Sequence, residues 1–303
     1  MKYRILAALA AVACCGACDT PRELAFLNVP TCRVATPPTP LSPELSETSG
    51  VVASRTSPGT VWTHTDSGTE PILYALDGKG TILSRVRLAI DTPDSDSDWE
   101  DLAAGACPLG ECLYVADIGD NAGSRPNVVV HRLAEPTSPA GKGAAVESFR
   151  MRFPEGPRDA EALFVMPGEH IYVVTKGGDG PIGIYEYPGS LDANEVVVLQ
   201  LVRNLTASQV QLGDRVTGAS ASADGRWIAL RTHVSVMVYA ADELLSDAGE
   251  VQPFVVSDVR PLAEPQGEGI GLGPNGTIVL TSEGGAPGIP GTMSVLWCDG
   301  LEE

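Results

Sequence analysis

The sequence predicts an all-β fold, a five-bladed β-propeller whose ring is closed by an N-terminal strand that completes the last blade. One unit, two short apolar strands joined by a turn, recurs five times, and its copies begin 51, 61, 56 and 51 residues apart. Four strands in about 50 residues is the size of one propeller blade. With 33 glycines, 24 prolines and 5% aromatic residues, the composition is typical of many short strands and turns.

The N-terminal residues predict export. Lys2 and Arg4 precede an apolar run that is too short to span a bilayer, and small residues and cysteines follow it. The segment "CCGACD" resembles a bacterial lipobox with Cys18 as the lipidated cysteine, although Cys15 stands where leucine is usual. We therefore expect a signal peptide and lipobox over residues 1–18. Lipidation at another of these cysteines, or secretion without an anchor, stays open.

The last copy of the repeat has only three strands before the chain ends, so its fourth strand has to come from elsewhere. The unassigned apolar segment 25–35 fits this place, because pairing it there removes the open edge of the sheet. We expect residues 19–36 to form a tether and this ring-closing strand, followed by an extended proline-rich connector, and residues 37–303 to form the propeller. The closure places Cys32 beside Cys298 and predicts a disulfide between them.

A second pair of cysteines, Cys107 and Cys112, lies at the turn of the second repeat. The two residues are close enough to close this turn as a disulfide, and two free thiols are the alternative. None of the four histidines stands at ligand spacing from the cysteines, which argues against a zinc site.

The chain carries a formal net charge of −19 at pH 7. This strong acidic balance argues against nucleic acid and anionic membrane surfaces as partners, and it favours solubility and cation binding. We expect a monomer that contacts the membrane only through a lipid anchor.

The residues that open the first strand of each repeat should surround the central channel, because this strand lines the axis of a propeller. They are three glutamates and two hydroxyl residues, namely Ser49, Glu100, Glu161, Thr217 and Glu268. Two carboxylates ~5 Å apart repel each other by about 3 kcal/mol at an effective dielectric near 20. Protonation, an arginine such as Arg215 or Arg158, or a hard cation would relieve this repulsion. Calcium accepts six to eight oxygens in loose geometry, so the ring predicts a calcium site, with a metal-free hydrogen-bonded cluster as the alternative.

Two further sets of polar residues should lie nearer the mouth of the channel. The residues two positions before the ring share its strand face and form a second layer, namely Glu47, Asp98, Asp159, Arg215 and Gln266. The ends of the second strands and the adjoining loops supply the residues of a mixed-charge mouth, namely Asp66, Asp117, Asp120, Asn121, Arg125, Arg158, Lys176, Arg231, His233 and Glu283. Such a mouth suits an anionic or polyol ligand, and the alternative is that its basic residues only offset the neighbouring acids.

The inner-strand pairs that begin with Ser49, Glu100, Glu161, Thr217 and Glu268 resemble those of the bacterial SdiA-regulated domain family. They also resemble the calcium-activated nucleotidase (apyrase) propellers, and this resemblance implies calcium ligation by the same five residues. The likeness covers about residues 45 to 285. Nucleotidases carry an Asp-Asp-Arg motif where this chain reads "THTDSG", with Asp66 but no arginine. This departure argues against nucleotide hydrolysis.

Two functions fit these observations. The first is an extracytoplasmic, lipid-anchored calcium-binding module of the cell envelope that presents its mouth to a small molecule, a glycan or a protein. The second is a calcium-dependent hydrolase of a phosphoester, an ester or a lactone, in which the metal polarises an oxygen or activates water. The sequence "GLGPNG" at 271–276 matches a dinucleotide-binding pattern, but its place between two short apolar strands predicts a hairpin turn instead.

Overall fold

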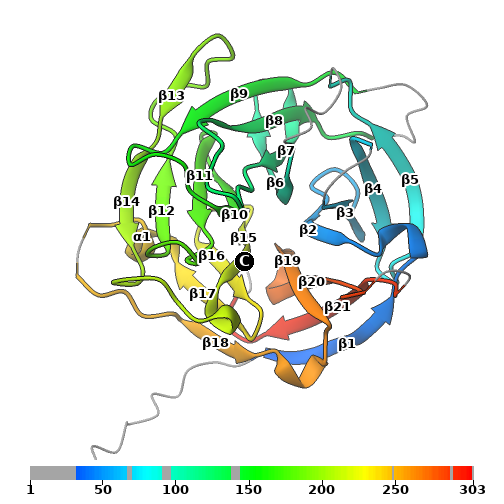
Figure 1. Ribbon diagram of the computed structural model, residues 1–303. Coiled ribbons are helices and arrows are strands. Elements are labelled where there is room, and N and C mark those ends of the chain that lie inside the picture. The colour runs from blue at the N-terminus through cyan, green and yellow to red at the C-terminus, as the bar shows by residue number, and fades with distance from the viewer. Residues whose placement is uncertain are drawn as a thin grey trace, which may run out of the picture.

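The computed structural model describes residues 32–66, 70–90, 97–137, 144–247, 249–286 and 289–301. These residues form a ring of five β-sheets around a central axis, which confirms the five-bladed β-propeller (Figure 1). The expected signal peptide and lipobox over 1–18, with Cys18, lie outside the described residues, as does most of the expected tether. No helix in the described ranges has the length and apolar character needed to cross a membrane.

Each blade has four antiparallel strands in the order inner to outer. Blade 1 consists of β2 (Thr48–Ala53), β3 (Thr60–Thr65), β4 (Ile72–Asp77) and β5 (Ile82–Arg87). Blade 2 consists of β6 (Trp99–Cys107), β7 (Gly110–Asp117), β8 (Val128–Ala134) and β9 (Glu147–Arg152). Blade 3 consists of β10 (Ala160–Met166), β11 (His170–Thr175), β12 (Gly183–Glu186) and β14 (Gln200–Asn204). Blade 4 consists of β15 (Val216–Ala221), β16 (Trp227–Thr232), β17 (Ser235–Ala240) and β18 (Val255–Asp258). Blade 5 consists of β19 (Gln266–Leu272), β20 (Thr277–Glu283), β21 (Thr292–Cys298) and β1 (Cys32–Pro40).

The N-terminal strand β1 closes the ring as predicted, by pairing antiparallel with β21 at the outside of blade 5. Cys32 lies opposite Cys298 in this pairing, and the two form a disulfide. The strand extends through three prolines that the sequence suggested would form a connector after it. Proline is tolerated here because an outermost strand needs hydrogen-bond donors on one side only. The strand therefore crosses the expected boundary between residues 36 and 37.

A few elements lie outside the regular blade pattern. Strand β13 (Val196–Val198) leaves blade 3 and pairs parallel with β9, so the sheet of blade 2 has five strands. A disulfide between Cys107 and Cys112 closes the turn between β6 and β7. The short helices are α1 (Ala241–Leu244) and the 3₁₀ turns η1 (Pro43–Leu45), η2 (Leu212–Asp214), η3 (Arg260–Leu262) and η4 (Pro274–Gly276). The η4 turn joins β19 to β20, so "GLGPNG" forms the predicted hairpin.

The hydrophobic core is divided among the blade interfaces. The five core clusters of the described residues each join two consecutive blades, including blade 5 with blade 1. Between blades 1 and 2, for example, Trp62 of β3 and Trp99 of β6 are both buried. Each blade thus buries its apolar faces against its neighbours, and the polar inner ends of the strands remain at the axis.

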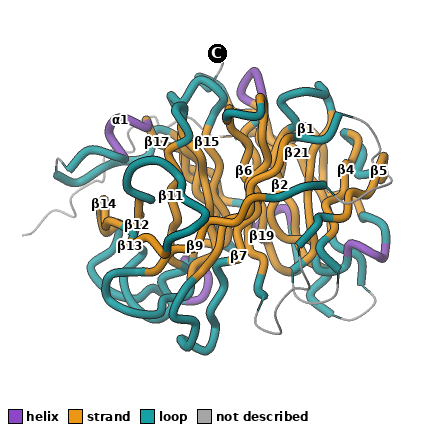
Figure 2. Tube along the Cα trace, turned by 90° about the horizontal axis from the view of Figure 1, so that it is seen from above, coloured by secondary structure: helices purple, strands orange, loops and turns teal. Residues whose placement is uncertain are grey.

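The two faces of the ring differ in what they carry. The inner strands β2, β6, β10, β15 and β19 all begin on one face, and Figure 2 shows the ring edge-on with turns at both faces. Because β1 runs antiparallel to β21, it begins with Cys32 on the opposite face and ends at Pro40 on the face where the inner strands begin. Residues preceding Cys32 therefore join the propeller on the face away from the inner-strand starts.

Candidate functional site

A β-bulge occurs at the predicted ring position in every blade. The pairing between the first and second strands loses register at Ser49, Glu100, Glu161, Thr217 and Glu268. A bulge bends the strand and changes the direction of the side chain at that point. The same local irregularity therefore presents all five residues at the axis, and all five are buried, with at most 6% of their surface exposed.

The two hydroxyl residues of the ring connect neighbouring blades. Ser49 Oγ donates a 2.6 Å hydrogen bond to the main-chain carbonyl of Glu100, and Thr217 Oγ1 donates a 3.0 Å bond to the carbonyl of Glu268. Each bond joins one inner strand to the next around the axis. Both hydroxyl protons are thus used by the scaffold, and the three carboxylates supply the charge at the centre.

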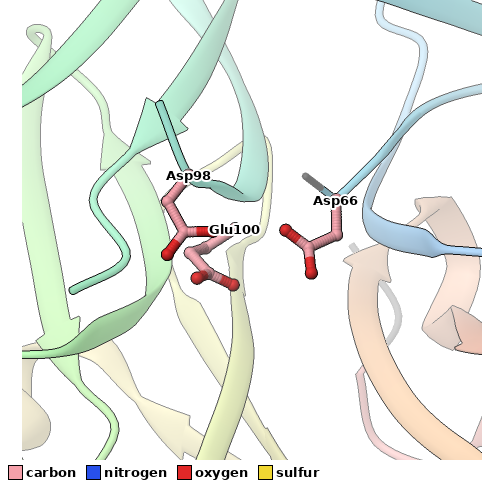
Figure 3. A group of neighbouring side chains, drawn as sticks. All are labelled: Asp66, Asp98 and Glu100. Carbon is pink, nitrogen blue, oxygen red and sulfur yellow. The ribbon is translucent and has the colours of Figure 1, made fainter. Parts of the chain in front are cut away.

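Glu100 belongs to two overlapping groups of carboxylates. Its carboxylate lies with those of Asp66 and Asp98 in one group, and with those of Asp159 and Glu161 in the other. Within each group one oxygen per residue lies within 4.8 Å of the other two. Figure 3 shows Asp98 and Glu100 from blade 2 facing Asp66, which follows β3 of blade 1. The ring and the second layer therefore meet in one acidic cluster that spans blades 1 to 3.

Lys176 neutralises part of this cluster. It follows β11, and its Nζ pairs with the Glu161 carboxylate and lies 3.5 Å from Asp159 Oδ2. Burial alone would lower the pKa of Lys176, but Glu161 and Asp159 raise it above its usual range. The lysine is therefore a fixed cation beside one of the two carboxylate groups.

Five carboxyls of the acidic cluster and the adjoining pocket have raised pKa values. Burial, followed by the charges of Glu161, Asp66 and Asp98, raises the pKa of Glu100 well above its usual value. Burial raises the pKa of Glu161 to about 7, against the opposing effect of Lys176. Burial and neighbouring acids raise the pKa of Asp98 to about 6 and that of Glu283 to about 7, and burial raises that of Glu268. A bound cation would relieve this mutual repulsion.

These residues open into a pocket of about 530 Å³ at the face where the inner strands begin. It is lined by four ring residues, two second-layer residues and five mouth residues from the sequence prediction, namely Ser49, Glu100, Glu161, Glu268, Arg215, Gln266, Asp66, Asn121, Lys176, His233 and Glu283. The pocket combines this acidic centre with three basic side chains on its wall. Burial and then the positive charges of Arg231, Lys176 and Arg215 lower the pKa of His233, against a hydrogen bond with Gly267.

The other predicted mouth residues lie outside the pocket lining and stabilise the loops around it. Arg125 forms a 2.7 Å ion pair with Asp117, and Asp120 accepts hydrogen bonds from the main chain of Ser124 and Arg125. Arg158 pairs with Asp179 at 3.1 Å. The main-chain N–H of Asp120 in turn donates to Asp159, so the loop is connected to the cluster.

Arg231, Glu47 and Thr217 also lie outside the lining. The guanidinium of Arg231 is fully buried, where it pairs with Glu264 and donates to the carbonyls of Gly269 and Thr281. Glu47 is exposed. Arg231 therefore connects blade 4, on which it lies, to the first two strands of blade 5.

Two acidic residues were missed by the sequence prediction. Asp101 is fully buried, and its carboxylate accepts hydrogen bonds from the main-chain N–H groups of Leu102, Leu163 and Ala219 at 2.8, 2.9 and 3.0 Å. It therefore joins blade 2 to blades 3 and 4 at the axis. The sequence does contain one sign that Asp101 is unusual, because the other four repeats have glycine or alanine at this position. Glu264 lines the pocket and continues the alternating polar pattern of Gln266 and Glu268 backwards by two residues.

The fold and the site define a five-bladed β-propeller with an acidic axial pocket. The fold is similar to that of the PQQ-bound aldose sugar dehydrogenase from Streptomyces coelicolor, at 10% identity over 89% of this chain and 98% of that chain, with a TM-score of 0.53. A glucose dehydrogenase matches at 10% identity over 85% and 98% of the two chains with a TM-score of 0.49. A gluconolactonase from Xanthomonas campestris matches at 12% identity over 79% and 68% with a TM-score of 0.41. No family model and no curated protein matches the sequence. At these identities the first likeness supports the propeller fold alone.

Proposed function

We propose that this protein is an exported calcium-binding propeller whose axial pocket binds a polar ligand. The observation that carries this proposal is the position of Glu100, which is 6% exposed and shared by two groups of three carboxylates. Calcium binds carboxylate oxygens in flexible geometry and completes its shell with water. The resemblance of the five ring residues to those of the calcium-activated nucleotidase propellers supports the same metal.

The cation would bind on the side of Glu100 that faces Asp66 and Asp98. Lys176 already supplies positive charge to Asp159 and Glu161 on the other side. The main chain at Gly119 packs against the carboxylates of Glu100 and Asp98. A Cβ atom at this position would lie 2.1 Å from Glu100 Oε1 and 2.5 Å from Asp98 Oδ2. Glu161 and Glu268, the other two ring carboxylates, lie at the equivalent bulges of blades 3 and 5.

Calorimetric titration of the protein with calcium after treatment with a chelator tests the site. A hundredfold excess over the dissociation constant should stabilise the fold by ~2.7 kcal/mol. Glu100→Gln should abolish both the heat of binding and the rise in melting temperature. Asp258→Asn is a matched control, because this carboxylate is exposed and pairs only locally with Arg260. A melting temperature that neither calcium nor chelator changes would contradict the proposal.

Export is supported by the two disulfides, which persist in oxidising compartments. If Cys18 carries the lipid, the chain reaches the propeller at Cys32, on the face opposite the pocket. The pocket would then face away from the membrane. Fractionation of cells that express Cys18→Ser should find the protein in the soluble fraction, whereas Cys14→Ser should stay with the membrane. Equal fractionation of the two variants would reject Cys18 as the anchor.

A calcium-dependent hydrolase of a phosphoester, an ester or a lactone is the second candidate. The pKa values of Glu161 and Glu283, both raised to about 7, favour it, because carboxyls of this kind exchange protons near neutral pH. A panel of phosphomonoesters, esters and lactones with and without calcium tests this function. Turnover that is lost in Glu161→Gln but kept in Asp258→Asn would support the hydrolase. Absence of turnover across the panel would leave ligand binding as the function.

A further inference from the structure

Arg215 differs from the other basic side chains around the pocket. It follows the η2 turn, directly before β15, and lines the pocket. Among the described residues, its buried Nε has no hydrogen-bond partner, as is also true of Arg231 Nε, but unlike Arg231 its guanidinium forms no ion pair. An unpartnered guanidinium retains donors in a planar fork that matches a carboxylate or a phosphate.

The neighbouring cations are all committed to the protein's own acids. Lys176 pairs with Glu161, Arg125 with Asp117, Arg158 with Asp179 and Arg231 with Glu264. The whole chain has 39 acidic and 20 basic residues, so acidic partners are abundant. Arg215 therefore differs from these neighbouring cations, because it lies at the wall of an acidic pocket and forms no ion pair with a described acid.

The guanidinium of Arg215 packs against the main chain of Gly178. A Cβ atom on Gly178 would lie 3.1 Å from Arg215 Cζ and 3.2 Å from Nε, which is tight contact for a side chain at this position. His233 lines the same pocket, and Arg215 contributes to the lowered pKa of this imidazole. The basic wall therefore combines a guanidinium that packs on glycine with a nearby imidazole.

We infer that Arg215 is the anion-binding residue of the axial pocket, and that the ligand is a polyhydroxylated carboxylate or phosphate. This inference deepens the proposed function and rests on its ligand pocket. The anionic group would pair with Arg215. The remainder of the ligand would face Glu268, Glu283 and Glu161, which accept hydrogen bonds when ionised and so require donors such as hydroxyls. A ligand with one anionic end and several hydroxyls satisfies both walls.

Binding measurements with three related probes test this assignment. Gluconate and glucose 6-phosphate each carry hydroxyls and an anionic group, and glucose carries the hydroxyls alone. In the presence of a chelator, at least one of the two anions should bind the wild-type protein about tenfold or more tightly than glucose, because charge-assisted hydrogen bonds are the stronger ones. The anion that binds identifies carboxylate or phosphate as the recognised group.

Arg215→Gln should abolish the preference for the anion, whereas Arg260→Gln, which changes an exposed arginine of a local ion pair, should keep it. Arg215→Lys keeps the charge without the fork, so it should show a partial loss and serves as the second variant if Arg215→Gln does not fold. Equal binding of glucose and both anions, no binding of any probe, or a preference that survives in Arg215→Gln and Arg215→Lys would overturn the inference. An Arg215-dependent preference, together with a melting temperature that calcium does not change, would uphold this inference while refuting the metal site.

Discussion

The ammonium of Lys176 and the carboxylate of Glu161 form an ion pair beside the axis of the propeller. The lysine follows the second strand of blade 3, and the glutamate lies at the bulge of its first strand. One blade thus supplies both an acid of the ring and the cation that neutralises it. This pair neutralises the side of the cluster around Asp159 and Glu161, whereas Glu100 also belongs to a second carboxylate group with Asp66 and Asp98.

Replacement of Lys176 should make the fold depend more strongly on calcium. Lys176→Met leaves Glu161 and Asp159 without their cation, and removal of one partner of a buried pair costs about 3 kcal/mol or more. We expect a lower urea midpoint in chelator and a larger gain on addition of calcium. Lys79→Met, at an exposed lysine, is the control. A midpoint equal to that of the wild type in chelator would show that the pair contributes nothing.

The raised carboxyl pKa values predict that the metal-free protein loses stability as pH rises from about 5 to 7.5. Glu161 and Glu283 titrate near pH 7 in the folded state, whereas unfolded glutamate has lost its proton by pH 6. The folded state therefore binds more protons in this window, and the free energy of unfolding falls by about 1.4 kcal/mol per pH unit for each additional proton. Urea titrations at four pH values in chelator measure the slope.

Two histidines with lowered pKa values act in the opposite direction in the lower part of this window. The lowered pKa values of His64 and His233 remove stability only as pH falls below about 6.5, where the unfolded imidazoles gain protons. Calcium should flatten the slope, because it binds the deprotonated carboxylates. Glu283→Gln should reduce the slope. A free energy of unfolding that rises with pH in chelator would contradict the assignment of these protons to the pocket.

The sequence predicted the parts of this protein that the repeat determines. Five in-register copies located the ring residues, and the bulge that turns them to the axis recurs at Glu100 and its four counterparts. The closure by β1 followed from an incomplete last blade. The proline-rich end of β1 was misassigned because proline argues against a strand unless the strand is known to be outermost.

The partners of the charged side chains could not be predicted in this way. Arg125, Arg158 and Arg231 were expected at the mouth, but all three form ion pairs within the protein. The partners of Arg158 and Arg231 lie on loops, and Arg125 itself lies on the loop after β7, and the repeat does not determine the conformation of these loops. Asp101 was overlooked because its partners are main-chain N–H groups of two other blades. Such contacts depend on how the blades pack around the axis, which strand register alone leaves open.

Asp101 should be required for stability rather than for metal binding. Its two oxygens accept three main-chain hydrogen bonds, and Asn at this position would turn one acceptor into an NH₂ group that faces N–H donors. Asp101→Asn should lower the free energy of unfolding by about 3 kcal/mol or more, since each buried unsatisfied group costs about 1–3 kcal/mol. Calcium affinity of the folded variant should change little, because both oxygens of Asp101 already accept main-chain hydrogen bonds. A tenfold loss of calcium affinity without a loss of stability would reassign Asp101 as a ligand.

The two disulfides should differ in their contribution to stability. Cys32 and Cys298 are 266 residues apart, whereas Cys107 and Cys112 are separated by 5. In the chain-entropy description a cross-link over the whole chain stabilises by about 5 kcal/mol and one over a single turn by about 2 kcal/mol. The double variant Cys32→Ser/Cys298→Ser should therefore lose more stability than Cys107→Ser/Cys112→Ser, and reductant should abolish the difference between each variant and the wild type. Urea titrations of the three proteins with and without reductant measure this. Equal losses in the two variants would contradict the dependence on loop length, and an unchanged midpoint in Cys32→Ser/Cys298→Ser would show that β1 holds the ring closed through its pairing with β21 alone.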